Sequence, residues 1–271
     1  MSGNLPRCLI DDSVTTALIS YPPRAGWVED ATGLELVPRL RATQLRIGQD
    51  CALIDSMEAT TIADRYAVIT DVALVSRFTG AVALWAPKRP DEIDGVTVAL
   101  DDVSLTAEAL AGATLRRHFG ITATAWDRAR SESEAVIQEG TVVLQEVADG
   151  HREDLVRAWS ILSGLPVPTH LLIVPRRLVE ADPDAVAALV SAFERLRDVG
   201  LARRRELRRN LTDELELDRD RLAAFQADQR LSLSGDARDG WLDLARRTSR
   251  ALNLPPVRQP LLVSIDAGSG D

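Results

Sequence analysis

The stretch GVTVALDDVSLTAEALAGATLRRHFG, residues 95–120, decides the fold. It opens with the β-branched run Gly95–Leu100, which predicts a buried strand. A helix closed by Gly120 should follow, because apolar residues recur at helical spacing at Ala107, Leu110, Ala111, Thr114 and Leu115. The hydroxyl residues Ser104 and Thr106 stand between the strand and the helix. Since free amides at a helix start attract anions, this turn either binds an anionic ligand or only caps the helix.

Composition and charge exclude some classes of partner. The chain has 271 residues and 45% hydrophobic content, which suffices for one large domain or for two lobes. With a net charge of −9 and only 4% aromatic residues, we expect no nucleic-acid partner. The arginine-rich run at 203–209 is followed by acidic residues, which is typical of a solvated helix.

Cysteine and histidine spacing gives no support for a metal site. The two cysteines, Cys8 and Cys51, form no CxxC pair, and the three histidines show no ligand spacing. The first residues lack the apolar segment of a signal peptide, and no run approaches the ~18 apolar residues of a membrane span. We therefore expect a cytoplasmic protein, monomer or homodimer, that does not enter a membrane.

Short apolar runs alternate with helical segments along much of the chain. Strands are predicted at 7–12, 34–38, 50–56, 66–76, 81–86, 96–100, 141–147 and 169–175. A short helix is predicted at 41–48, and helices follow from about residue 183. This alternation predicts an α/β protein with largely parallel sheets.

The order of the elements further predicts two lobes. Residues 81–175 are expected to form an inserted α/β lobe. Residues 1–80 and 176–271 are expected to form a discontinuous first lobe that carries the C-terminal helices. The chain would then cross between the lobes near residues 78 and 175. Clefts between lobes are common ligand sites, so a ligand site is expected between them.

Four segments resemble one enzyme family in their order. They are VPRLRATQLRIGQDCALIDSMEA (37–59), VTVALDDVSLTAEAL (96–110), DLVRAWSILSGLPVPTHLLIV (154–174) and RLSLSGDARDGWLDLARRTSRALNL (230–254). Together they resemble the chorismate dehydratase branch of the menaquinone-biosynthesis enzymes of the futalosine route. The resemblance implies a two-lobed periplasmic-binding-protein-like type II fold. It also implies a cytoplasmic lyase that removes water from chorismate, a small anionic dicarboxylate, to give 3-enolpyruvylbenzoate without a metal or an organic cofactor.

The resemblance and the turn positions nominate six site residues. The candidates for substrate binding are Ser56, Thr79, Ser104 and Thr106, and those for proton transfer are Glu146 and Asp11. Each also has a structural interpretation, because hydroxyl residues and aspartate cap helices or stabilise turns, and a glutamate at a strand end is commonly exposed. His170 stands beside Pro168 and before an apolar strand, and we expect a structural role for it.

Several positions depart from the family pattern. The N-terminal segment CLIDDSVTTALIS lacks the Asn that reaches the substrate in the family. Leu105 and Ala107 replace an Arg and a Ser, and Asp55 replaces a Pro. The carboxylates in CLIDDS would repel a dicarboxylate unless they are protonated or turned away. A non-catalytic binding protein for a small anionic metabolite on the same fold is therefore the alternative hypothesis.

Overall fold

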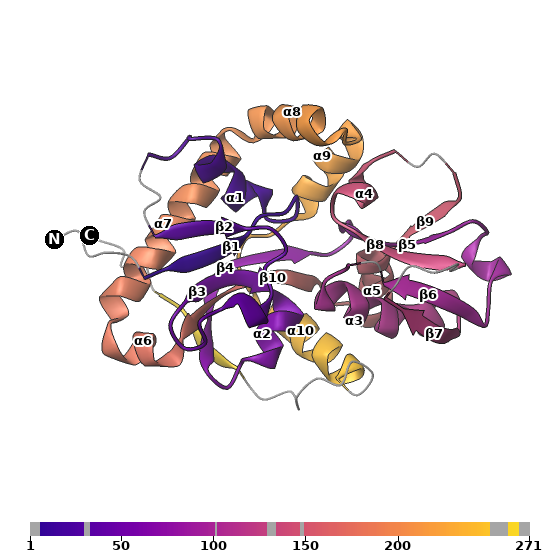
Figure 1. Cartoon of the computed structure of the whole chain (residues 1–271), viewed down its shortest axis with the longest axis horizontal. Helices are drawn as coiled ribbons and strands as arrows, with labels where there is room; N and C mark the ends of the chain where they lie inside the picture. The colour runs from indigo at the N-terminus through magenta and orange to yellow at the C-terminus, as the bar shows by residue number, and fades with distance from the viewer. Residues whose placement is uncertain are drawn as a thin grey trace.

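The computed structural model of the chain describes residues 6–29, 33–100, 102–128, 134–146, 149–249 and 260–265. These residues form two α/β lobes, each built on its own sheet, which lie side by side in Figure 1. The predicted α/β class and two-lobed architecture are confirmed. Both sheets are mixed, however, and not largely parallel as predicted.

The first lobe contains a six-stranded sheet in the order β11-β4-β10-β3-β1-β2. Its strands are β1 (Cys8–Asp11), β2 (Leu34–Val37), β3 (Cys51–Asp55), β4 (Tyr66–Ser76), β10 (Val167–Pro175) and β11 (Leu261–Val263). Strand β1 runs parallel to β2 and β3, whereas β10 runs antiparallel to both β3 and β4. Strands β3 and β10 are buried along their whole lengths, as expected for inner strands covered on both faces.

Helices cover both faces of this sheet. On one face α7 (Pro183–Ala202) packs its apolar stripe, which includes Leu189 and Phe193, against the strands. On the other face lie α2 (Ser56–Thr61) and α10 (Gly235–Thr248), below the sheet in Figure 1. The remaining helices of this lobe are α1 (Ala17–Arg24), α6 (Arg176–Ala181), α8 (Arg204–Leu215) and α9 (Arg219–Asp228), and a 3₁₀ turn, η1, spans Ala42–Gln44.

The second lobe contains a five-stranded sheet in the order β7-β6-β8-β5-β9. Its strands are β5 (Val82–Ala86), β6 (Val96–Leu100), β7 (Ala123–Asp127), β8 (Ala135–Glu139) and β9 (His151–Asp154). Its helices are α3 (Leu105–Thr114), α4 (Thr141–Leu144) and α5 (Leu155–Ser163), with shorter turns at η2 (Pro90–Glu92) and η3 (Leu115–Phe119).

The stretch 95–120 folds as its sequence predicts. Strand β6 is followed by Ser104, whose side chain accepts the amide of Ala107 at 3.1 Å and so caps α3. The helix continues through η3 and ends at Gly120, which takes the left-handed φ of 77°. Ser104 therefore caps the helix, as the capping interpretation predicts. A cap can also face a ligand, so this contact does not exclude the second interpretation.

The chain crosses between the lobes at 77–81 and again at 164–166. The first crossing includes residue 78. The second differs from the predicted boundary at 175, because β10 is a buried inner strand of the first sheet, so residues 167–175 belong to the first lobe. Nη2 of Arg77 donates to the carbonyl oxygen of Gly164 at 3.0 Å, which ties the two crossings together.

Two local predictions are wrong. The segment 41–48 was predicted as a helix but forms only the single turn η1. The first amide of this turn, that of Ala42, donates to the side chain of Glu58 in α2 at 3.1 Å. Residues 141–147 were expected to form a strand, but the strand β8 ends earlier, at Glu139. Gly140 then takes a φ of 74°, and the short helix α4 begins at Thr141.

One apolar core continues from the first lobe into the second. It joins Ile54 and Met57 of the first lobe to Leu110 of α3, Trp159 of α5 and Trp241 of α10. Burial of this kind across a lobe boundary holds the two sheets in a defined relation, because separating the lobes would expose apolar surface. Packed apolar side chains thus join the two lobes and fix the relative position of the walls of the site between them.

Candidate functional site

A cavity of about 230 Å³ lies between the lobes. The first lobe lines it with the end of β1 and residues 12–15, with the loop 38–41 after β2, and with Asp55 and His170. The second lobe contributes Asp102, Ser104 and the segment 139–141 at the end of β8. Ligand sites of open α/β sheets lie at the carboxyl ends of parallel strands, and the ends of β1, β3 and β8 all meet here.

The centre of the site is a buried pair formed by Asp11 and His170. Nε2 of His170 lies 3.1 Å from Oδ2 of Asp11, and Oδ1 of Asp11 accepts the amide of Leu40 at 2.8 Å. Burial tends to raise the pKa of Asp11, but its contacts with His170 and Leu40 outweigh burial and lower that pKa. Nδ1 of His170 is buried and has no hydrogen-bond partner among the described residues. The pair thus leaves one ring nitrogen for another group.

Further carboxylates surround His170 and favour its protonated form. Asp55 is its direct partner in the β3–β10 register, and it also caps α2 by accepting the amides of Met57 and Glu58, each at 3.0 Å. Burial alone would lower the pKa of His170, but Asp11, Asp55 and Glu139 together raise it above its ordinary value. The imidazole is therefore held more readily in its cationic form.

Glu139 lies at the end of β8, on the second lobe's side of the cavity. It accepts a hydrogen bond from the amide of Ser104 at 2.6 Å and another from the Ser104 hydroxyl at 2.8 Å. Burial and the charge of Asp55 raise the pKa of Glu139 above its usual range, although the bonds from Ser104 oppose the shift. Ser104 therefore caps α3, faces the cavity and holds this carboxylate in place.

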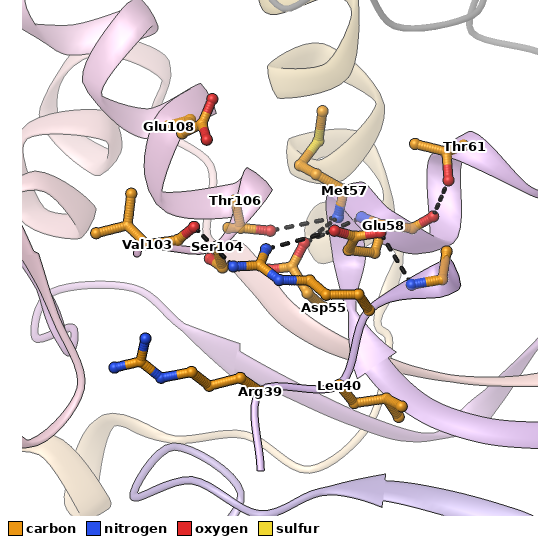
Figure 2. A network of polar contacts seen from close by, with 12 residues as sticks. Arg39, Leu40, Asp55, Met57, Glu58, Thr61, Val103, Ser104, Thr106 and Glu108 are labelled. Atoms are coloured by element: carbon orange, nitrogen blue, oxygen red, sulfur yellow. Dashed lines mark hydrogen bonds and ion pairs between the residues drawn. The ribbon is translucent and has the colours of Figure 1, made fainter. Parts of the chain in front are cut away.

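Two arginines stand at the mouth of the cavity on the loop after β2. Arg39 pairs with Asp102 of the second lobe. Arg41 donates to the carbonyl oxygen of Val103 at 3.0 Å and lies 3.4 Å from Glu58. Figure 2 shows Arg39, Glu58 and Val103 around this network. The mouth thus carries cationic groups, while the interior carries carboxylates around one imidazole.

Three of the four predicted binding residues lie outside the cavity lining. Ser56 and Thr106 face each other across the lobe boundary with their hydroxyl oxygens 3.0 Å apart. Thr106 also accepts the amide of Met57 at 3.3 Å, as Figure 2 shows. Thr79 lies in the first crossing, where its amide donates to Asp228 at 3.0 Å. These residues join the lobes, and only Ser104 among the four lines the cavity.

The two predicted proton-transfer residues have different environments. Asp11 lies in the cavity wall, where it holds His170. Glu146 is exposed in the segment after α4 and is not part of the lining. The carboxylate that faces the cavity from this part of the chain is Glu139, seven residues earlier.

Glu139 and Arg39 line the cavity but were not nominated from the sequence, and His170 was expected to have a structural role. Glu139 had a usable signal, because the apolar run before it and Gly140 after it mark a strand end. For His170, the place beside Pro168 and before an apolar strand favoured a structural role, and its partner Asp11 is brought to it by the pairing of β10 beside β3. Arg39 lies in the family-like segment 37–59, but no arginine there was singled out from the sequence.

The described residues contain no group of three or more His, Cys, Asp or Glu side chains arranged to hold a metal ion. None of the described helices is long and apolar enough to cross a membrane. The chemistry available from the cavity residues themselves is acid–base chemistry, with an imidazole and a carboxyl group, both of raised pKa, in the wall of one cavity.

Solved structures of other proteins share this two-lobed fold. A protein from Archaeoglobus fulgidus superposes with a TM-score of 0.69 at 15% identity, covering 94% of this chain and 100% of that one. The alkanesulfonate-binding protein SsuA from Xanthomonas axonopodis pv. citri, bound to MOPS, gives 0.67 at 13% identity, with 98% and 100% covered. The periplasmic aliphatic sulphonate binding protein SsuA from Escherichia coli gives 0.65 at 12% identity, with 94% and 95% covered.

The chain thus has a periplasmic-binding-protein-like fold with a cavity between its two lobes. A family model described as menaquinone biosynthesis matches residues 34–250, which is most of the chain. The chain belongs to this menaquinone biosynthesis family. No curated protein matches it significantly in sequence.

Proposed function

We propose that the protein is a cytoplasmic lyase of menaquinone biosynthesis, of the chorismate dehydratase type, and that the cavity between the lobes is its active site. The observation that carries the proposal is the presence of Glu139 and His170 in the wall of one cavity. Elimination of water needs a base for a carbon-bound proton and an acid for the leaving hydroxyl. The cavity supplies one group of each kind, and family membership supports the pathway.

Glu139 acts as the base in this proposal and His170 as the acid. Glu139 takes a ring proton, and the electrons of that C–H bond become the new ring double bond. The bond between the ring and its hydroxyl oxygen breaks, and the oxygen leaves with the electron pair, takes a proton from His170 and departs as water. The ring becomes aromatic, which drives the reaction, so the protein mainly has to orient the substrate and move protons.

The pKa shifts agree with these roles. A carboxylate with a raised pKa is a stronger base than an ordinary glutamate, provided that it is ionised at the working pH. An imidazole with a raised pKa is protonated over a wider range and is ready to donate. Asp11 lines the cavity but is held in contact with His170. We therefore assign Asp11 the role of positioning His170.

The carboxylates of Asp11 and Asp12 repel an anionic substrate less than their charges suggest, because each is paired with another group. Asp11 is engaged by His170 and by the amide of Leu40, and Asp12 lies 3.4 Å from Arg24. The arginines at the mouth provide positive charge for an anionic substrate, and so does the imidazole whenever it is protonated. A dicarboxylate therefore meets a partly neutralised cavity.

The test is incubation of the purified protein with chorismate, with product followed by absorbance and mass. We expect 3-enolpyruvylbenzoate from the wild-type protein, and a loss of kcat of about 10²- to 10⁴-fold in Glu139→Gln and in His170→Gln. As a matched control, Glu146→Gln removes a carboxylate that lies outside the cavity lining and should keep wild-type activity.

A non-catalytic binding protein for a small anionic metabolite is the second candidate, and the sulfonate-binding neighbours favour it. Absence of product together with a chorismate-dependent rise in melting temperature would support this candidate and overturn the dehydratase proposal. Absence of both product and thermal shift would reject chorismate as the ligand.

A further inference from the structure

The mouth of the cavity holds an ion pair that crosses from one lobe to the other. Arg39 lies in the loop after β2, and Asp102 lies in the loop after β6. Nη1 of Arg39 pairs with Oδ2 of Asp102 and also donates to the Asp102 carbonyl oxygen at 3.3 Å. Both residues line the cavity, so the pair faces the space that a ligand would occupy. We refer to these two residues as the Arg39–Asp102 pair.

The backbone of both partners is strained. Arg39 has a φ of 54° and Asp102 a φ of 52°, which is the left-handed region that residues other than glycine avoid. Among the described residues, Glu216 is the one other non-glycine with positive φ, and it ends α8, where this conformation is common. Strained residues of this kind cluster at ligand clamps and switch regions. Here two of them face each other across the mouth of one cavity.

The carboxylate of Asp102 lies where two arginines could bind the carboxylate of a ligand. Its Oδ1 lies 3.9 Å from Nη2 of Arg41, so its carboxylate lies against two guanidinium groups. The side chains of Arg39 and Asp102 are 63% and 61% exposed, so water and solutes reach both. Exposed pairs contribute little to stability, and their partners exchange readily. Arginine binds carboxylates with particular preference because its planar fork donates two parallel hydrogen bonds.

We propose that Asp102 is an internal substitute for a ligand carboxylate, which an entering ligand displaces from Arg39. Arg39 then binds one carboxylate of the ligand, and Asp102 sets the affinity by competition. The class of ligand is a small carboxylate, and its identity as chorismate rests on the function proposed above. Arg39 is thus a specificity residue at the mouth, separate from the acid–base groups in the interior.

The experiment measures the affinity for chorismate by calorimetry, with Glu139→Gln present in every protein compared, so that the ligand is not consumed during the titration. Asp102→Asn removes the competing charge, and asparagine tolerates the left-handed backbone as well as aspartate does, so the variant should fold. We expect Asp102→Asn to bind chorismate about five- to tenfold more tightly than the wild-type protein. Arg39→Gln should bind about tenfold more weakly. In a protein that already carries Arg39→Gln, adding Asp102→Asn should change the affinity for chorismate much less than it does in the wild-type protein.

Asp12→Asn is the matched control, because Asp12 lines the same cavity but pairs with Arg24. It should change the affinity at most about twofold, as expected for a general charge effect. Three outcomes would overturn the proposal. Asp102→Asn and the wild-type protein could bind chorismate with equal affinity, neither could bind it, or Asp12→Asn could show the same gain in affinity as Asp102→Asn. Turnover is measured separately: tighter binding by Asp102→Asn without any product would keep this proposal and overturn the dehydratase assignment.

Discussion

His170 on β10 and Asp11 at the end of β1 are 159 residues apart in sequence, and Nε2 of His170 lies 3.1 Å from Oδ2 of Asp11. Both side chains are buried in the wall of the cavity between the lobes. The contact gives the imidazole a fixed orientation and leaves its Nδ1 without a partner among the described residues. One carboxylate in contact and two more nearby raise the pKa of His170, which agrees with the acid role that we propose for it.

Asp11→Asn should shift the pH dependence of activity. Asp11 raises the pKa of His170 through its hydrogen bond and its charge, so the variant should lower that pKa. Because His170 acts as the acid in the proposed mechanism, the limb on which activity falls with rising pH should move to lower pH by about one unit. The measurement is a kcat profile from pH 5 to 9 with chorismate. A lower kcat with an unmoved limb would assign Asp11 a structural role only.

Ser104→Ala and Thr106→Ala should separate the ligand site from the lobe contact. Ser104 caps α3 and donates to Glu139, so its loss should cost about 1 kcal/mol of stability and raise the pKa of Glu139 further. The limb on which activity rises with pH should then move to higher pH. Thr106→Ala breaks the buried contact with Ser56 and should cost about 1–3 kcal/mol, with KM unchanged.

Thr106→Ser is the control for this comparison, because it keeps the hydroxyl that faces Ser56. It should recover much of the stability lost in Thr106→Ala. Urea denaturation and steady-state kinetics measure the two effects independently. An increase in KM in Thr106→Ala, or a shift of its pH limb like the one expected for Ser104→Ala, would place Thr106 in the binding site after all.

Asp154 should make the protein less stable as the pH rises from about 4 to 6. Burial raises its pKa from 3.8 to about 6, although the amides of Gly80, Arg157 and Val156 that it accepts oppose the shift. Between these values the folded protein binds a proton that the unfolded chain releases, so stability falls with pH and levels off above about 6. The loss is on the order of 2 kcal/mol.

Asp154→Asn should remove this contribution while keeping a side-chain oxygen that accepts amides. The free energy of unfolding of both proteins, measured by urea denaturation at pH 4.5 and pH 7, gives the difference directly. Equal pH dependence in the two proteins would contradict the assignment.

Gly80→Ala should destabilise the first crossing between the lobes. A Cβ at Gly80 would lie 2.3 Å from Cγ2 and 2.7 Å from Cβ of Val156, so α5 or the crossing would have to shift. Overpacking of this kind costs about 1–3 kcal/mol. Gly235→Ala is the matched control, because a Cβ there meets no atom within 4 Å and Gly235 starts α10. Thermal denaturation of the two variants should lower Tm in Gly80→Ala alone.

The sequence by itself determined the elements whose signals are local. The strand 66–76 has the predicted bounds, and the helix after Ser104 runs to Gly120 because spacing, cap and left-handed glycine act within a few residues. It also determined the α/β class and the cleft. The strand predicted at 141–147 failed because Gly140 ends β8 with a φ of 74°, a conformation that periodicity does not report.

Only the tertiary structure decided which side chains meet. Strand β10 enters the first sheet antiparallel between β3 and β4, and this pairing brings His170 beside Asp55 and Asp11. The packing of the lobes joins Ser56 to Thr106, which the sequence had suggested as ligand contacts, and it brings Arg39 to Asp102. Such contacts depend on the path of the whole chain, because strand order and lobe packing are set by burial over many residues and not by neighbours.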